Sequence, residues 1–239
     1  MRHEPDLLRR PVEGANLTEN AYLRLKREII ELERPPGSAF SEQEVAKAWG
    51  LSKTPVREAL ARLHRDGLVR PMPRAGYVVS PVTLKDVADL CDMRSLLQSE
   101  AAALTARRGL PAPLRHRLAE LCVDDDHGQL GGPHLEERLR ANYEFEAIIA
   151  EGSGNDRLAA AIVGVLDEIE RVVRLMLRLD PSMPPQRIEE RKAVVDAIQA
   201  GEPDAARRAM RRRTESARSE ILNALTSSPA VTSASIPVP

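Results

Sequence analysis

Basic side chains are concentrated in one short part of this chain, residues 47–74. That stretch holds seven cations and two anions, although the whole chain has 35 Lys and Arg against 36 Asp and Glu and a net charge of -1. The seven cations are Lys47, Lys53, Arg57, Arg62, Arg65, Arg70 and Arg74. A local charge of +5 in a near-neutral chain is the pattern of a surface that binds a polyanion.

Three short helices are expected around this stretch. In residues 19–33 apolar side chains recur at helical spacing, and a Pro-Pro-Gly sequence follows that a helix does not continue through. Ser41 and Glu44 have the spacing of a capping box, which begins a second helix that Gly50 ends. Ser52 opens a third helix, with a proline in its first turn, where a missing N–H is tolerated.

Two β-prone runs follow the third helix, at residues 68–70 and 77–79. Prolines and a glycine separate them, which is typical of two strands joined by a turn with its tip at residues 74–76. Three helices followed by a β-hairpin is the order of a winged helix-turn-helix.

The first turns of the third helix offer the polar groups that such a fold uses on DNA. A recognition helix enters the major groove with its N-terminal residues toward the base edges, where hydroxyls suit phosphates and Lys or Arg reaches guanine or phosphate. The wing tip approaches the DNA backbone or the minor groove, and Gln43 is placed to contact a phosphate. The predicted DNA-binding residues are Gln43, Ser52, Lys53, Thr54, Arg57, Arg74 and Gly76. The alternative is a basic, solvated face of a small helical domain.

Beyond Pro81 the pattern is helical throughout, with about six segments separated by Pro and Gly. We therefore expect a mainly α chain: a winged helix-turn-helix with three helices and a small β-hairpin, then an all-α antiparallel bundle. The expected organisation is a disordered arm at 1–16, the DNA-binding domain at 17–80, the helical domain at 83–226 and a disordered tail at 227–239.

Other classes of protein are disfavoured. No apolar run spans a bilayer and the N-terminus lacks the apolar core of a signal peptide, so a cytoplasmic location without a membrane partner is expected. Cys91 and Cys122 are expected to be packed thiols. An enzyme is the alternative of another class, but the chain has no G-x-S-x-G, phosphate-binding Gly-rich loop or H-E-x-x-H.

Residues 35–79 resemble the winged helix of GntR-family bacterial transcription regulators, above all in TPVREAL at Thr54 to Leu60. The segments DMRSLL, FEAIIAEGSGN and ERKAVVDAIQAGEPDAARRAM, at residues 92–97, 145–155 and 190–210, resemble the FCD effector domain of the FadR subfamily. The resemblance implies that the recognition helix and wing contact DNA. The family commonly has Arg at the positions of Gln43 and Lys53, so bidentate reading of guanine is not expected from these two residues.

The resemblance also implies where an effector binds. Many FCD domains hold a divalent metal with an Asp or Asn and three His, and those positions fall here on Asn142, Glu146, Arg191 and Arg213. All three imidazoles are absent, and a guanidinium does not ligate a cation. We therefore expect no metal and no other cofactor.

Two interpretations of these arginines remain open. In one, Arg191 and Arg213 replace the charge of the metal, and Arg94, at a position that often meets the effector in the family, completes a site for a carboxylate or phosphate. In the other, Glu146 neutralises the arginines in a buried network that fills the cavity. The predicted function is a homodimeric transcription regulator, acting as a repressor on a palindromic operator and responding to a small organic acid. The alternative is a regulator whose helical domain senses nothing.

Overall fold

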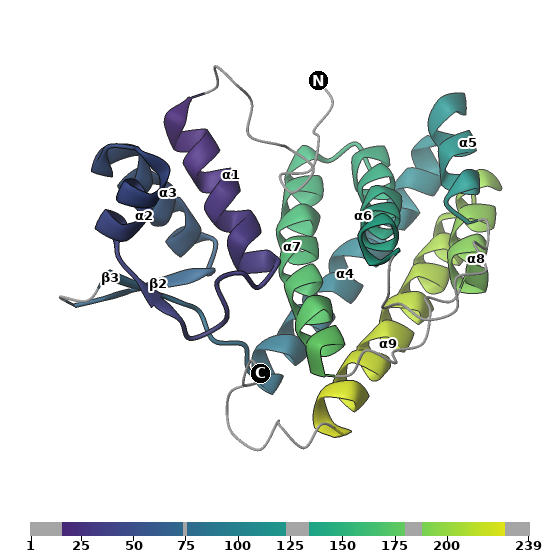
Figure 1. Ribbon diagram of the computed structural model, residues 1–239. Coiled ribbons are helices and arrows are strands. Elements are labelled where there is room, and N and C mark those ends of the chain that lie inside the picture. The colour runs from purple at the N-terminus through teal and green to yellow at the C-terminus, as the bar shows by residue number, and fades with distance from the viewer. Residues whose placement is uncertain (1–15, 74–75, 123–133, 180–187, 228–239) are drawn as a thin grey trace. The chain divides into compact units, whose positions relative to one another are not determined.

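The computed structural model describes residues 16–73, 76–122, 134–179 and 188–227 (Figure 1). The chain divides into two compact units between Thr83 and Leu84. No helix in the described ranges combines the length and the hydropathy that crossing a membrane requires.

The N-terminal unit contains three helices and three strands among its described residues. They are α1 (Leu17–Ile30), β1 (Ala39–Phe40), α2 (Glu42–Trp49), α3 (Lys53–Arg65), β2 (Val69–Met72) and β3 (Gly76–Val79). The predicted winged helix-turn-helix is confirmed. The strand β1 was not predicted, because two residues are too short for a periodicity to be detected.

Local capping explains where these helices begin and end. The capping box of α2 is present: Ser41 Oγ accepts from the Glu44 N–H at 3.1 Å, and the Ser41 N–H donates to Glu44 Oε2 at 2.7 Å. Gly50 ends α2 in the left-handed conformation at φ 65°. Asn16 caps α1 through a bond from the Thr18 N–H to its Oδ1, at 2.9 Å.

These ends correct two predicted boundaries. Asn16 belongs to a helix cap and Ser227 is the last residue of the last helix, so neither belongs to a disordered segment. The remainder of the predicted arm and tail lies outside the described residues.

The core of this unit forms where α1 packs against α3. Leu25 and Ile29 of α1 and Leu60 and Leu63 of α3 are fully buried, and Val69 of β2 closes the same cluster. Burying an aliphatic side chain of this size stabilises a fold by about 1.5–3 kcal/mol. The packing fixes which face of α3 is turned outward.

The three strands form an antiparallel sheet in the order β1-β3-β2. Phe40 pairs with Tyr77 on one side of β3, and Met72 pairs with Gly76 on the other. The proline in β2 is tolerated because β2 is an edge strand. Gly76 has a φ of 92°, and a Cβ at this position would lie 2.5 Å from the Phe40 carbonyl oxygen.

The described part of the C-terminal unit is entirely helical, which confirms the predicted bundle. Its helices are α4 (Leu84–Arg108), α5 (Ala112–Glu120), α6 (Leu135–Gly152), α7 (Asp156–Leu179), α8 (Ile188–Gln199) and α9 (Pro203–Ser227). The helix α4 lies at its centre, in contact with α6, α7, α8 and α9, and its most extensive contact is with α9. Side chains from four helices therefore meet in the interior beside α4.

Candidate functional site

The start of α3 presents a polar face. Ser52, Lys53, Thr54 and Arg57 are all exposed, while Val56 faces the core and is fully buried. Ser52 is the residue at the N-cap, yet its side chain makes no bond to the end of the helix. The first N–H groups of α3 are thus not capped by this side chain, and N–H groups at a helix N-terminus suit a phosphate.

Side chains of α2 meet this face. Lys53 Nζ lies 3.5 Å from Gln43 Oε1, so the structure brings these two predicted residues together. Arg57 Nε donates to both carboxylate oxygens of Glu42, at 3.1 and 3.3 Å. Glu42 was missed at the sequence level because only the fold places it opposite Arg57. Arg57 is 64% exposed, so this ion pair is weak and a DNA phosphate or base can replace it.

Of the two residues predicted to contact DNA from the wing, only Gly76 lies in the described part of the chain. Arg74 lies outside the described residues. Gly76 lies next to β1, and the close approach of the Phe40 carbonyl explains the glycine without any DNA contact. A contact between Gly76 and DNA stays a prediction.

The second candidate site is a buried arginine cluster in the C-terminal unit. It is made by Arg94 of α4, Asn142 and Glu146 of α6, Arg191 of α8 and Arg213 of α9. All five residues predicted to bind the effector therefore lie together, although 119 positions separate the first from the last. Asn142 and Glu146 share one face of α6, because residues four apart are neighbours on a helix.

Two oxygens hold this cluster together. Glu146 Oε1 accepts from Arg94 Nη2 at 3.1 Å and from Arg213 Nη1. Asn142 Oδ1 accepts from Arg213 Nη2 at 2.8 Å and from Arg191 Nη2 at 3.2 Å. Among the described residues, Glu146 Oε2 has no hydrogen-bond partner. Each of these two oxygens thus accepts hydrogen bonds from two guanidinium groups.

Three further residues contact the arginine cluster, and the sequence did not single them out. Gln98 Oε1 accepts from Arg94 Nε at 3.2 Å, one helical turn along α4. The Leu121 carbonyl accepts from Arg191 Nη1 at 3.1 Å. The ring of Phe145 lies 5.4 Å from the Arg191 Cζ and 5.2 Å from the Arg213 Cζ, within the range of cation–π attraction. For Gln98, the sequence did contain a signal: it lies four residues after Arg94, and residues four apart are neighbours on a helix.

The cluster is charged although it is buried. The side chains of Arg94, Glu146 and Arg213 are only 6%, 1% and 7% exposed. Burial alone raises the pKa of Glu146, but Arg213 and Arg94 outweigh it and hold that pKa below its usual value. Burial lowers the pKa of Arg94, and Glu146 opposes this change. Two cations therefore share one anion in a region of little solvent.

These donors do not fit a divalent metal. Asn142 Oδ1 and Glu146 Oε1, on two residues that the resemblance places at metal-ligand positions, both accept from guanidiniums. Among the described residues, no group of three or more His, Cys, Asp or Glu is arranged to hold a metal ion.

A winged helix with an exposed basic recognition helix, joined to a helical domain with a charged interior, defines the class of DNA-binding regulators with a separate ligand-responsive domain. Two family models match the chain: "Bacterial regulatory proteins, gntR family" over residues 17–79 and "FCD domain" over residues 89–216. The chain belongs to the GntR family of bacterial regulatory proteins and carries an FCD effector-binding domain.

Similar proteins agree with this assignment. An HTH-type transcriptional regulator in an unstable DNA locus of Streptomyces ambofaciens is 32% identical over 83% of this chain and 82% of its own length. A probable D-xylose utilization operon transcriptional repressor of Paenarthrobacter nicotinovorans is 26% identical over 77% of this chain and 79% of its own length. The structure of McbR/YncC from E. coli has the same fold, with a TM-score of 0.70 at 21% identity over 87% of this chain and 98% of that chain. The family is one of bacterial transcription regulators.

Proposed function

We propose that this chain is a homodimeric repressor that binds a palindromic operator and is released when a small organic anion enters the buried arginine cluster, without a metal ion. The single observation that carries the proposal is that Arg94 and Arg213 share one carboxylate oxygen, that of Glu146. Two buried cations opposite one anion favour the entry of a second negative charge. Guanidinium groups bind carboxylates and phosphates through two parallel bonds.

Two-fold symmetry follows from the DNA-binding unit. One winged helix reads only a half-site, so a symmetric dimer matches a palindromic operator. The repressor named in Paenarthrobacter supports repression as the sign of regulation. An effector acts by binding more tightly to the form of the dimer that does not fit the operator.

One observation favours the other candidate, a regulator whose helical domain binds no effector. Glu146 is 1% exposed and already accepts from both arginines, so it neutralises part of the charge that an effector would meet. In this second case the cluster only holds α4, α6 and α9 together.

Calorimetric titration separates the two candidates. A panel of small organic acids and inorganic phosphate is titrated into the full chain, with and without a chelator. The proposal expects saturable binding of at least one anion that the chelator does not change. Substituting Arg213→Gln weakens this binding about 10-fold or more, because a charged hydrogen bond to the anion is lost. The control is Arg212→Gln, the exposed neighbour on the same helix.

Three outcomes contradict the effector proposal. An affinity that falls when the chelator is added indicates a metal site. Binding that Arg213→Gln does not weaken lies elsewhere in the chain. The absence of binding by every anion supports the filled cluster.

A further inference from the structure

A groove lies between α4 and α9, with a volume of about 540 Å³. Such a volume is in the range of sites that hold small molecules. None of the five residues of the buried arginine cluster lines it. Ser95 and Thr214, which do, directly follow Arg94 and Arg213 along the chain, and successive residues of a helix point in directions about 100° apart. The groove is therefore separate from the proposed effector site.

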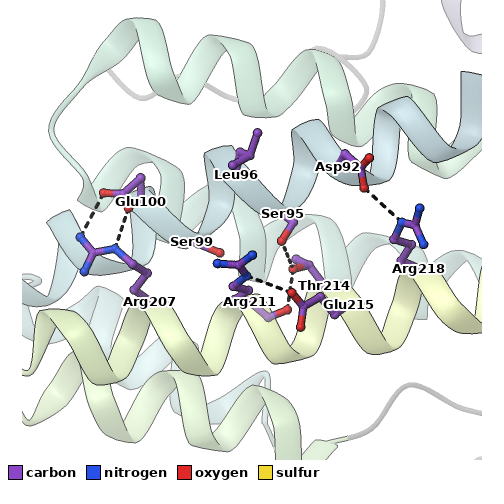
Figure 2. A pocket seen from close by; sticks show the side chains of 10 residues that line it. All are labelled: Asp92, Ser95, Leu96, Ser99, Glu100, Arg207, Arg211, Thr214, Glu215 and Arg218. Atoms are coloured by element: carbon purple, nitrogen blue, oxygen red, sulfur yellow. Dashed lines mark hydrogen bonds and ion pairs between the residues drawn. The ribbon is translucent and has the colours of Figure 1, made fainter.

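Three hydroxyl groups line the groove between the two helices (Figure 2). Thr214 Oγ1 and Ser95 Oγ lie within hydrogen-bonding distance, at 3.1 Å, and this contact links α9 to α4. Ser99 lies one turn after Ser95 on α4 and is 5% exposed. In the described part of the chain its hydroxyl has no hydrogen-bond partner. A buried hydroxyl without a partner opposes folding, so a ligand atom that bonds to it gains affinity.

Three ion pairs surround these hydroxyls, and they place both signs of charge in the groove (Figure 2). Glu100 and Arg207 form the pair near one end, and Asp92 and Arg218 form the pair near the other. The two acidic residues are eight positions apart on α4, which corresponds to about 12 Å along the helix. A ligand with only one sign of charge would be repelled by the charged residues of the same sign, which are half of the charged residues that line the groove.

The third pair is the one that a ligand displaces most easily. Arg211 Nε donates to Glu215 Oε1 at 2.9 Å, and both residues belong to the same helix. Their side chains are 68% and 54% exposed, and such exposed pairs contribute little to stability. A carboxylate and an ammonium group on one small molecule replace this pair with two new ones.

We propose that the groove binds a small zwitterion of the amino acid or short-peptide class. Its carboxylate pairs with Arg211 and, once the Ser99 side chain rotates toward the groove, accepts from the Ser99 hydroxyl, and its ammonium group pairs with Glu215. Leu96, which is 70% exposed and lines the same groove, offers contact to an apolar side chain of the ligand.

Titration calorimetry of the full chain with the dipeptide glycyl-leucine tests this proposal. The matched controls are the N-acetylated dipeptide, which is only an anion, and the dipeptide amide, which is only a cation. The zwitterion is expected to bind at least 10-fold more tightly than either control. Substituting Arg211→Gln weakens that binding about 10-fold, and Ser99→Ala weakens it several-fold. The control variant is Arg212→Gln, which removes the adjacent exposed cation and lies outside the groove.

The proposal is overturned if no zwitterion binds, or if both single-charge forms bind as well as the dipeptide. It is also overturned if binding persists in the Arg211→Gln variant but is lost in Arg213→Gln, since the heat then belongs to the buried arginine cluster. A change in self-association of the Arg211→Gln variant in sedimentation, without a change in dipeptide binding, would assign the groove to an interface between copies of this chain.

Discussion

Removing the charge of Glu146 should strongly destabilise the C-terminal unit. Glu146→Gln keeps the size of the side chain and an acceptor oxygen but removes the carboxylate that, among the described residues, bonds both Arg94 and Arg213. Breaking a buried ion pair from one side destabilises a protein by about 3–5 kcal/mol. Because the amide still accepts a hydrogen bond, we expect the lower value, a loss of about 3 kcal/mol. For a unit of this size that loss corresponds to a decrease in Tm of about 10 °C.

The chain offers a matched control on the same helix. Glu144 also accepts from an arginine, through bonds of 2.7 Å from Arg117 Nε and Nη2, but it is 32% exposed. Surface pairs of this kind contribute at most about 1 kcal/mol. Glu144→Gln should therefore lower the Tm of the same unit by no more than about 3 °C. Scanning calorimetry of the full chain follows both variants.

The direction in which the stability of the C-terminal unit changes with pH can be checked. The arginines hold the pKa of Glu146 below its usual value, so its stabilising effect is complete above about pH 4.3, the pKa of an unfolded Glu. It is lost only as the pH falls further, toward the lower pKa of the folded state. The stability difference between the wild type and Glu146→Gln should thus be constant from pH 7 to about pH 5 and shrink at lower pH. A Tm for Glu146→Gln equal to that of Glu144→Gln would refute the reasoning.

Three further substitutions test the DNA-binding unit. Lys53→Ala should weaken DNA binding and reduce the slope of log affinity against log salt by about 1 in fluorescence anisotropy, since one phosphate contact is lost; an unchanged slope removes Lys53 from the interface. Gly76→Ala should destabilise the unit by about 1–3 kcal/mol in chemical denaturation, because the φ of 92° and the Phe40 carbonyl both oppose a Cβ; a neutral effect contradicts the sheet geometry. Ser41→Ala should destabilise the unit by about 1 kcal/mol in the same assay, through loss of the capping box, and an effect below a few tenths would indicate that the cap is dispensable.

Local signals in the sequence were sufficient for most of the fold. The capping box at Ser41 and Glu44 and the glycine after α2 act over a few residues, so their pattern predicts the helix without tertiary information. The strand β1 was missed because Ala39 and Phe40 become a strand only by pairing with β3. The same pairing explains Gly76, for which the sequence suggested a DNA contact.

The candidate sites, like the fold, could be predicted from the sequence only in part. Arg191 and Arg213, which the resemblance places at metal-ligand positions, were visible in the sequence, and the structure places them together. The sharing of one Glu146 oxygen by Arg94 and Arg213 was not, because it depends on how α4, α6 and α9 approach each other. The pair of Arg57 with Glu42 likewise depends on the crossing of α2 and α3.

Anisotropy of a labelled promoter fragment, taken from beside the gene for this chain, tests whether an anion in the buried arginine cluster controls DNA binding. The fragment is bound by the full chain in the presence of a chelator, and small organic acids are then added. At least one acid is expected to lower the DNA affinity of the wild type and of Arg212→Gln but not that of Arg213→Gln. A DNA affinity that no anion changes, or a response that the chelator abolishes, would contradict it.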